Sequence, residues 1–575
     1  MAGGLTRREL LGRSLRAGVG LAASGFAVTE LQAQARNGTA GKALEPGFRA
    51  LDRFVRDYMR VMDAPGMTLV VADRGGVLRV AAYRFSDIDR AVPVDANHLF
   101  EIGSITKSFV ALAVLQLADE KKIDLHRPIA ELMPWLKVES AFAPITVHHL
   151  LSHTSGLPES LNCQLSDQHA KLHTRYAPGE HFTYCNLGYQ ALGYLLWSID
   201  GRPFADVIRE RILRPLRMDA TEPVISGDTR RREPRSYNAF LDDRPFVRGA
   251  PLKPAPPLIM DNAAGCIAST PHDMGRYIQM LANRGKGEHG AIVSEGGFER
   301  MTTPHTKAEE LGPGVAYGYG LMIDTLDGHK VVRHTGGMVS FASAMQIDLD
   351  EGVGVFASIN ARQGYRPNPV AQYALLLMRA LNRGQALPRP PELTTAATIP
   401  NAADFAGTFS SPAGMKMELV ADAKALFVLQ NGRKLPVETS GGGFVVRDLV
   451  LGRWELNFQR ETGPESPVTD LIHGADWLFN QRYAGTREFT YPDAWDAYAG
   501  HYRNDSPWYG SLRVVKAKGR LWIDGLVPLE PAGDAVFWLN EPPHNPGRIE
   551  FFNTIAGKCM HAKLSGEDFW RVMVP

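Results

Sequence analysis

A proline- and threonine-rich stretch at residues 383–400 divides the chain into two parts of different character. Clusters of this composition interrupt both helices and strands, so they predict a linker. Before it, helical apolar spacing alternates with strand-like runs; after it, short strands and turn residues dominate. The chain has 575 residues and is 44% hydrophobic, which is enough for several domains with separate cores.

The part before the linker predicts one α/β (α+β) domain over residues 46–382. Strand-like runs at 67–73 and 77–85 flank Arg74-Gly75-Gly76, and a second pair at 342–350 and 353–359 flanks Glu351-Gly352. Each pair is typical of a β-hairpin. Helical spacing marks residues 46–62, 104–120, 187–199 and 370–381. Strands at both ends with helices between them indicate one antiparallel sheet packed by helices.

The part after the linker contains an internal repeat. Residues 405–409 match residues 498–502, residues 426–428 match 521–523, and residues 454–458 correspond to 549–552. A repeat of this length marks a duplicated structural unit. We therefore predict two small all-β domains at 401–490 and 491–575, each an antiparallel barrel.

The charge balance argues against a nucleic-acid partner. Lysine and arginine total 63 against 62 for aspartate and glutamate, and nucleic-acid binding favours a basic surface. The arginines at 230–235 are interrupted by Glu233 and are interpreted as a solvated loop. The four cysteines, at positions 163, 185, 266 and 559, are too few for a disulfide scaffold. Whether any disulfide forms stays open.

The N-terminus predicts export. Arg7 and Arg8 precede an uncharged stretch at 17–28, and Ala33-Gln34-Ala35 offers small residues for a signal peptidase. The stretch is too short to span a bilayer. Residues 1–35 therefore resemble a twin-arginine signal peptide, and the mature protein is expected to be periplasmic or secreted, with no integral membrane span.

Ser104 and Lys107 form an S-x-x-K motif at the start of a strongly apolar predicted helix. Residues i and i+3 share one helix face, so the hydroxyl and the amine would be neighbours. A serine becomes a nucleophile when a base takes its proton, and a partly buried lysine can act as that base.

Two further motifs offer catalytic groups. Tyr184 can relay a proton if a nearby cation lowers its pKa, and the Asn186 amide can bond both Lys107 and a substrate carbonyl. In the run from His334 to Gly337, Thr335 and Gly336 can also contact substrate. The backbone N–H groups of Gly337 and Ser104 could form an oxyanion hole.

A metal alternative rests on His148, His149 and His153, because His149 and His153 have the i, i+4 spacing that suits zinc on a helix. No glutamate stands at the position that a zinc peptidase motif requires. Cys185, inside the tyrosine motif, is assigned to packing.

The order and spacing of the three motifs resemble the penicillin-recognising serine hydrolases, which include class C β-lactamases, D,D-peptidases, D-aminopeptidases and esterases. Tyr184 follows Ser104 by 80 residues, and His334 follows after 150 more. Segments at 145–159, 178–196, 211–221 and 263–281 share this resemblance, which extends over about residues 48–382.

The resemblance implies a role for each matching residue. Ser104 corresponds to the acylated nucleophile, Lys107 to its proton acceptor, Tyr184 to the second general base, Asn186 to the substrate-positioning amide and Gly337 to an oxyanion donor. It also places residues 251–262 beside the cleft. No cofactor or metal is expected, and the partner is a small-molecule or peptide substrate.

His334 stands where many family members carry lysine. Imidazole is mostly neutral above its usual pKa of about 6.5, so we expect weaker selection for a substrate carboxylate. The alternative to an enzyme is a non-catalytic binder of cell-wall peptides with the β domains as docking modules. The sequence fixes neither the acyl donor nor the oligomeric state.

Overall fold

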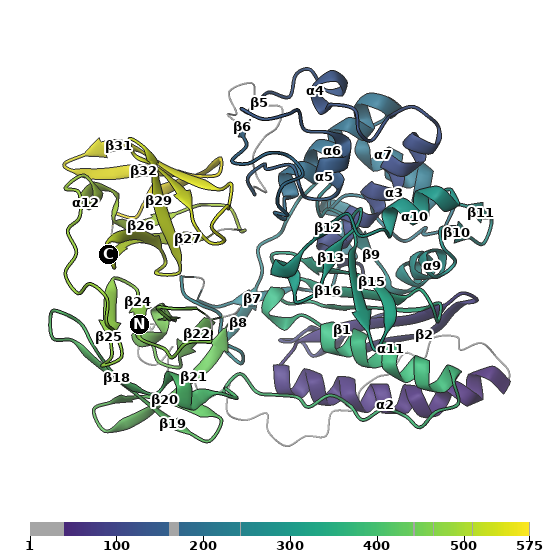
Figure 1. Ribbon diagram of the computed structural model, residues 1–575. Helices are drawn as coiled ribbons and strands as arrows, with labels where there is room; N and C mark the ends of the chain where they lie inside the picture. Colours follow the sequence, from purple (N-terminus) through teal and green to yellow (C-terminus); the bar gives the residue numbers. More distant parts are fainter. Residues whose placement is uncertain are drawn as a thin grey trace, which may run out of the picture.

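The computed structural model describes residues 39–159, 172–241, 243–440, 443–463, 465–508 and 510–573. The predicted signal peptide and Cys163 lie outside these residues. An α/β domain is followed by two β-barrels, which lie side by side along one flank of it (Figure 1). This arrangement confirms the predicted fold class. Within the described residues, no helix combines the length and the apolar character that crossing a membrane requires.

The α/β domain is built on a nine-stranded sheet of order β12-β13-β14-β15-β16-β17-β1-β2-β3. All of its neighbouring strands are antiparallel, as predicted. Both predicted hairpins form, β1–β2 and β16–β17, and β1 pairs with β17 to join the two ends of the domain. The strands are β1 (Gly66–Asp73), β2 (Gly76–Asp87), β3 (Val92–Pro93), β12 (Thr306–Lys307), β13 (Ala316–Tyr317), β14 (Met322–Leu326), β15 (His329–Gly337), β16 (Ala342–Asp348) and β17 (Val353–Ile359).

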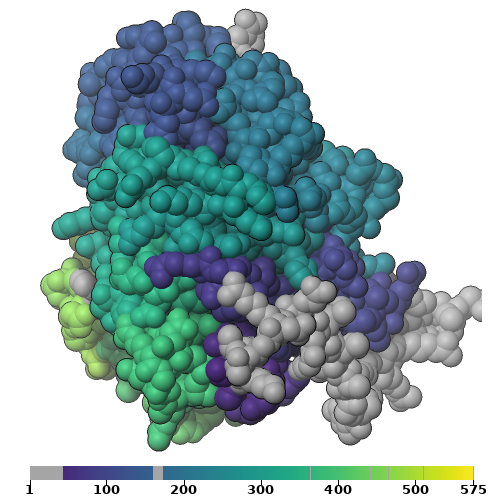
Figure 2. All heavy atoms as spheres, turned by 90° about the vertical axis from the view of Figure 1, so that its right-hand side faces the viewer, coloured from purple at the N-terminus to yellow at the C-terminus, as the bar shows by residue number. Residues whose placement is uncertain are grey.

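Helices cover both faces of this sheet because its central strands are apolar on both sides. In β1, Met67, Leu69 and Val71 belong to the core formed with α2 (Thr39–Met62) and α11 (Asn368–Asn382). The alternate residues Val70 and Ala72 belong to the core formed with α9 (Pro271–Ala282). This alternation follows from the two-residue period of a strand. Figure 2 shows the purple α2 beside the teal and green residues of the sheet and α11.

A helical region lies above the sheet around α3 (Thr106–Asp119), which is buried over most of its length (Figure 1). The expected helix at 104–120 is instead a 3₁₀ turn, η1 (Gly103–Ile105), followed by α3. The α6 helix (Asn186–Asp200) packs beside α3 and ends at Gly201, whose φ is 82°. The other α-helices described in this domain are α4 (Ile129–Leu132), α5 (Val147–Leu151), α7 (Phe204–Ile208), α8 (Gly227–Arg231) and α10 (Glu295–Met301). Short paired strands are β4 (Phe100–Glu101) with β9 (Ala268–Ser269), β5 (Val138–Glu139) with β6 (Leu172–His173), β7 (Tyr237–Ala239) with β8 (Leu252–Pro254), and β10 (Lys286–Gly287) with β11 (Gly290–Ala291).

The arginine-rich segment at 230–235 is not wholly a loop. Arg230 and Arg231 close the short helix α8, where Ser226 caps the N-terminus and makes a helical turn favourable. Arg232 and Arg235 form exposed ion pairs with Glu222 and Asp89. The segment is thus a surface whose charges are locally balanced.

Both predicted barrels form, and each closes with eight strands among the described residues. The repeated segments fall on equivalent strands: the first (β18, β26), the third (β20, β28) and the sixth (β23, β31) of each barrel. The first barrel contains β18 (Gly407–Ser410), β19 (Lys416–Asp422), β20 (Ala425–Gln430), β21 (Arg433–Ser440), β22 (Gly443–Val446), β23 (Glu455–Gln459), β24 (Asp470–His473) and β25 (Asp476–Phe479). The second follows α12 (Trp495–Tyr498) and contains β26 (Gly500–Arg503), β27 (Ser511–Ala517), β28 (Arg520–Ile523), β29 (Val527–Gly533), β30 (Val536–Leu539), β31 (Arg548–Ile555), β32 (Lys558–Leu564) and β33 (Glu567–Arg571).

Polar contacts attach both barrels to the α/β domain. In the second barrel, the carbonyls of Leu539 and Asn545 accept hydrogen bonds from Arg175 at 3.0 and 2.7 Å. In the first barrel, Ser440 Oγ donates to the carbonyl of Phe246 at 2.7 Å. The barrels therefore lie against the domain that carries the predicted catalytic residues.

Candidate active site

Two glycines bring the segment that carries Ser104 against strand β15. Gly103, directly before Ser104, has a φ of 53°, which glycine adopts without strain. A Cβ on Gly103 would lie 2.8 Å from the backbone nitrogen of Gly337. A Cβ on Gly336 would lie 1.9 Å from the carbonyl oxygen of Ile102. Both positions therefore exclude a side chain, and this close approach holds Ser104 beside Gly337.

Lys107 lies on the first turn of α3 and is fully buried. Its Nζ is 3.1 Å from Ser104 Oγ, 2.5 Å from Asn186 Oδ1 and 2.8 Å from the carbonyl oxygen of Ala264. These three acceptors satisfy every N–H of an ammonium group. Burial lowers the pKa of Lys107 to about 7, against the opposing effect of Glu159. A neutral amine that can accept the proton of Ser104 is therefore accessible near neutral pH.

Glu159 belongs to this network, although sequence reasoning misses it. One carboxylate oxygen accepts from the backbone N–H of Asn186 at 2.7 Å, and the other accepts from the Asn186 side-chain amide. Asn186 thus connects Glu159 to Lys107. Burial raises the pKa of Glu159 to about 7. The only signal was its place at the end of the segment 145–159 that resembles the hydrolase family.

Tyr184 lies next to Ser104 and Lys107 but differs from expectation in its ionisation. The Lys107 Nζ is 4.8 Å from the centroid of the Tyr184 ring. Burial raises the pKa of Tyr184 well above its usual value, and a hydrogen bond with Ser104 offsets this only in part. The expected lowering by a nearby cation does not occur because the cost of burying a phenolate is larger. Tyr184 is a protonated phenol, which suits a proton donor.

His334 lines the cavity as a neutral imidazole. Its Nδ1 is 2.7 Å from the carbonyl oxygen of Thr335, so it must donate there, and its Nε2 can accept from the hydroxyl of Tyr317 at 3.1 Å. Burial and the like charge of Lys107 lower the pKa of His334 to about 3. Both ring nitrogens are engaged within the protein, so His334 presents no cation to a substrate.

These residues surround a cavity of about 310 Å³. The predicted residues that line it are Ser104, Tyr184, Asn186, His334, Thr335 and Gly337. Lys107 lies beneath the cavity, and Gly336 packs against Ile102 instead of lining it. Met260, from the segment 251–262 expected beside the cleft, also lines the cavity. The lining also includes Arg366, after β17, and Trp508, from the second barrel, which, like Glu159, sequence reasoning misses.

The histidines of the metal alternative do not share one helix face. Helix α5 ends at Leu151, and His153 has a φ of 58°, which removes the i, i+4 geometry. His149 Nδ1 accepts from the backbone N–H of Thr146 at 3.1 Å as part of a capping box. His153 Nδ1 accepts from the backbone N–H of Cys185 at 3.0 Å, which helps to hold the tyrosine motif. Cys185, Cys266 and Cys559 are free and buried.

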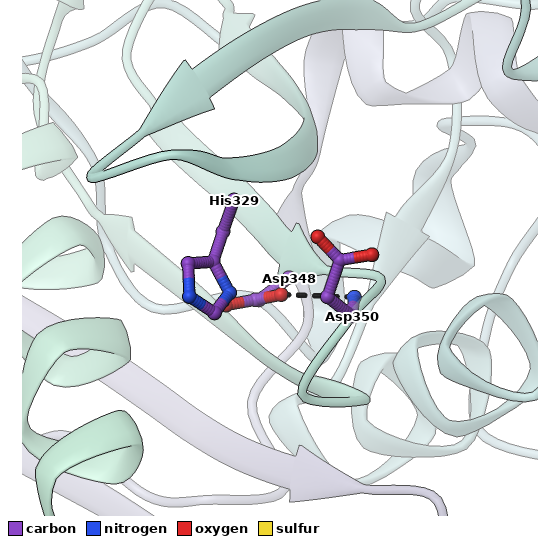
Figure 3. Close-up of side chains that lie close together, drawn as sticks. All are labelled: His329, Asp348 and Asp350. Atoms are coloured by element: carbon purple, nitrogen blue, oxygen red, sulfur yellow. Dashed lines mark hydrogen bonds and ion pairs between the residues drawn. The ribbon is translucent and has the colours of Figure 1, made fainter.

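A second group of metal-ligating side chains lies away from this cavity. Among the described residues, only His329, Asp348 and Asp350 bring three ligand atoms within 4.8 Å of one another (Figure 3). Asp348 accepts from Arg379, from the backbone N–H of Asp350 at 3.0 Å and from that of Glu351 at 3.0 Å. Since Arg379 of α11 already neutralises this carboxylate, we interpret the group as an ion-pair network that fixes α11 to the β16–β17 turn.

Comparison with known proteins identifies the family. Residues 51–379 match the family described as Beta-lactamase, which is more than half of the chain. The chain belongs to the β-lactamase family. Its α/β domain has the β-lactamase fold of serine hydrolases, and the predicted resemblance is confirmed.

Relatives of this β-lactamase family member are distant. Protein flp of Staphylococcus aureus is 22% identical over 334 residues, which cover 56% of this chain and 64% of flp. The chain thus spans less than two thirds of the length of flp. A structure described as an octameric penicillin-binding protein homologue from Pyrococcus abyssi is 25% identical with a TM-score of 0.54, covering 75% of this chain and 100% of that one. A D-stereospecific amidohydrolase from Streptomyces is 24% identical with a TM-score of 0.46, covering 60% and 99%.

Proposed function

We propose that this protein is a serine hydrolase that cleaves an amide or ester through an acyl-enzyme on Ser104. The observation that carries the proposal is the 3.1 Å contact between Ser104 Oγ and the buried Lys107 amine, whose pKa is about 7. A lysine with its usual pKa of about 10.4 would hold its proton and could not activate the serine.

Acylation begins when the neutral amine of Lys107 accepts the Ser104 proton while Oγ attacks the substrate carbonyl carbon. The new Oγ–C bond creates a tetrahedral intermediate, and we assign the stabilisation of its oxyanion to the backbone N–H groups of Ser104 and Gly337. Asn186 holds Lys107 through its side-chain oxygen at 2.5 Å, which fixes the amine against the hydroxyl.

Tyr184 completes acylation by protonating the leaving group. Its raised pKa keeps the phenol protonated, and Tyr184 lines the same cavity as Ser104, with its ring centroid 4.8 Å from Lys107 Nζ. The C–N or C–O bond breaks as the phenol gives up its proton, and the Lys107 ammonium restores that proton. Water then attacks the acyl carbon while the neutral Lys107 amine accepts one of its protons. The C–Oγ bond breaks, that proton passes to Ser104 Oγ, and the acid is released.

The neutral His334 restricts the substrate class. A carboxylate next to the scissile bond, as in β-lactams and D-Ala-D-Ala ends, gains no ion pair from this imidazole. We therefore propose that D-aminoacyl amides and short acyl esters are turned over at least as well as substrates that carry this carboxylate. A matched carboxylate substrate and its amide test this: similar kcat/KM values are expected, and a strong preference for the acid contradicts it.

The direct test is Ser104→Ala in the full chain. Labelling by a fluorophosphonate probe and turnover of D-aminoacyl amides, acyl esters and a chromogenic cephalosporin should all be lost. Ser108→Ala is the matched control, since Ser108 lies one turn further along α3 and its hydroxyl donates to the carbonyl of Ile105 at 2.7 Å. Activity that survives Ser104→Ala refutes the mechanism, and labelling of the unmodified protein without turnover favours the non-catalytic binder.

We also propose that the chain is exported through residues 1–35. The support is the paired Arg7 and Arg8 before an uncharged stretch and the Ala33-Gln34-Ala35 segment. Residues 1–40 fused to a reporter should direct its export. Export that persists after Arg7→Lys combined with Arg8→Lys contradicts the twin-arginine route.

A further inference from the structure

A second and larger cavity lies between the α/β domain, the linker and the first barrel. Its volume is about 880 Å³, against about 310 Å³ for the catalytic cavity. Its lining comes from α2, the loop after β7, the segment after β17, linker residues 391–394 and the first barrel. In Figure 1, β7 and β8 lie between the sheet of the α/β domain and this barrel.

The lining of this interdomain cavity is rich in arginine. Arg244, Arg248, Arg362 and Arg366 all contribute to it. Arg244 is neutralised by Asp243, whose carboxylate lies 3.0 Å away. Arg248 and Arg362 form no ion pair with any carboxylate in the described parts of the chain.

Two carboxylates also line the cavity but do not balance this charge. Glu392 and Glu455 belong to the lining, and in the described parts of the chain neither forms an ion pair with Arg248 or Arg362. Burial raises the pKa of Glu455 to about 7, so its negative charge is incomplete at neutral pH. The cavity therefore keeps an excess of positive charge.

Residues 362–366, which carry two of these arginines, are held in place from two sides. The hydroxyl of Tyr58 in α2 donates to the carbonyl of Arg366 at 2.6 Å. The guanidinium of Arg362 lies over the ring of Phe246, 5.0 Å from its centroid. A Cβ on Gly364 would lie 2.6 Å from this ring, and Ser440 of the first barrel fixes the Phe246 backbone. The first barrel thus helps to shape the site.

We propose that Arg248, Arg362 and Arg366 form a binding site for an oxyanion, a carboxylate or phosphate, in the interdomain cavity. A guanidinium presents a planar set of N–H donors that matches two oxygens of such a group. Leaving a partly buried guanidinium without an anion is unfavourable, and burial lowers the pKa of Arg362. An oxyanion supplies the missing negative charge.

Arg366 lines both cavities, so the oxyanion site adjoins the catalytic cavity. The oxyanion can therefore have two sources: the remote end of a substrate whose carbonyl lies at Ser104, or a free anion. The first source rests on the proposed function, whereas the second does not. A carboxylate at the remote end is compatible with a neutral His334, because it lies away from the scissile bond.

The first experiment measures binding of inorganic phosphate to the full chain by calorimetry at constant ionic strength, with chloride as the balancing anion. Arg362→Gln and Arg248→Gln should each weaken phosphate binding about tenfold or more, the loss expected for one charge-assisted contact. Arg244→Gln is the matched control, since that side chain lines the same cavity but is already paired. It should change the Kd by less than about threefold.

The second experiment measures kcat/KM for aryl esters of dicarboxylic acids of increasing chain length, each beside a neutral ester with a terminal methyl group. The ratio of charged to neutral substrate should peak at one chain length in the unmodified protein. That peak should fall about tenfold in Arg362→Gln and remain in Arg244→Gln. Arg362→Lys should restore part of it.

The outcomes are distinct. A length-dependent peak supports the site with the substrate as source, and phosphate binding without a peak supports it with a free anion as source. Absence of both overturns the proposal, as does a response that persists in both Arg248→Gln and Arg362→Gln. Far-ultraviolet circular dichroism identifies a variant that fails to fold, and the other arginine variant then decides. If no substrate is hydrolysed, the proposed function fails while phosphate binding still tests the site.

Discussion

Replacing Glu159 with glutamine tests how the protein sets the charge of Lys107. Asn186 separates the two groups, since it accepts from Lys107 Nζ at 2.5 Å and donates its backbone N–H to Glu159 at 2.7 Å. A charge separation of roughly 6 Å at an effective dielectric constant of about 20 gives an attraction of about 3 kcal/mol. One pKa unit corresponds to about 1.4 kcal/mol, and Glu159 is only partly ionised near pH 7. We therefore expect Glu159→Gln to lower the pKa of Lys107 by about 1–2 units.

The assay is kcat/KM for an uncharged ester between about pH 4 and pH 9. Activity requires the neutral amine, so in the unmodified protein it should rise through a pKa of about 7. Removing the carboxylate disfavours the ammonium form, and this acid limb should move to about pH 5–6 in Glu159→Gln. The maximum rate should also fall, because glutamine offers one acceptor where Asn186 donates two hydrogen bonds.

Glu310→Gln is the matched control. Its carboxylate accepts from the backbone N–H of Tyr184 at 3.3 Å but is not among the charges that act on Lys107. The acid limb should stay in place in this variant. If the acid limb of Glu159→Gln stays at the same pH or moves to a higher pH, Lys107 is not the base whose ionisation limits the reaction.

Three further substitutions test separate parts of the structure. Tyr184→Phe removes the phenol, so turnover of an amide should fall about a hundredfold or more and that of an ester with a good leaving group should fall less; equal losses contradict the leaving-group role. Trp508→Ala removes a ring that lines the catalytic cavity, so kcat/KM for a bulky acyl ester should rise relative to that for an acetyl ester, and an unchanged ratio shows that the second barrel does not restrict substrate size. Gly336→Ala places a Cβ 1.9 Å from the Ile102 carbonyl oxygen and should lower the free energy of unfolding in urea by more than about 3 kcal/mol. Gly296→Ala, whose Cβ would meet no atom within 4 Å, should change it by less than about 1 kcal/mol, and equal effects of the two substitutions contradict the steric argument.

The parts of the site that are built from residues close together in the sequence could be predicted. Ser104 and Lys107 are three residues apart, so the helical turn alone brings them together. The hairpins β1–β2 and β16–β17 follow from strand patterns that flank short turns. The barrels follow from the repeat, whose matched segments occupy equivalent strands.

The residues that sequence reasoning misses reach the cavity through long-range packing. Glu159 is 27 residues from Asn186, its hydrogen-bond partner. Trp508 lies in the second barrel, and Arg366 lies in the segment that follows β17. No local pattern distinguishes these side chains from the other glutamates, arginines and tryptophans of the chain. His153 shows the converse: its spacing offered a zinc alternative, which required α5 to continue beyond Leu151.

Under the two proposals above, nucleophile activation and anion recognition are carried out by separate charged groups of this protein. Lys107 already lowers the pKa of His334 through like-charge repulsion, so a cation at position 334 would repel the Lys107 ammonium in the same small cavity. The proposed anion-binding charge at Arg362 lies in the neighbouring cavity and avoids that repulsion. Glu159→Gln should therefore shift the pH profile without changing the preference for charged substrates, and Arg362→Gln should do the reverse. In the double variant the two effects should add within about 0.5 kcal/mol, whereas a larger coupling energy shows that the two cavities act as one site.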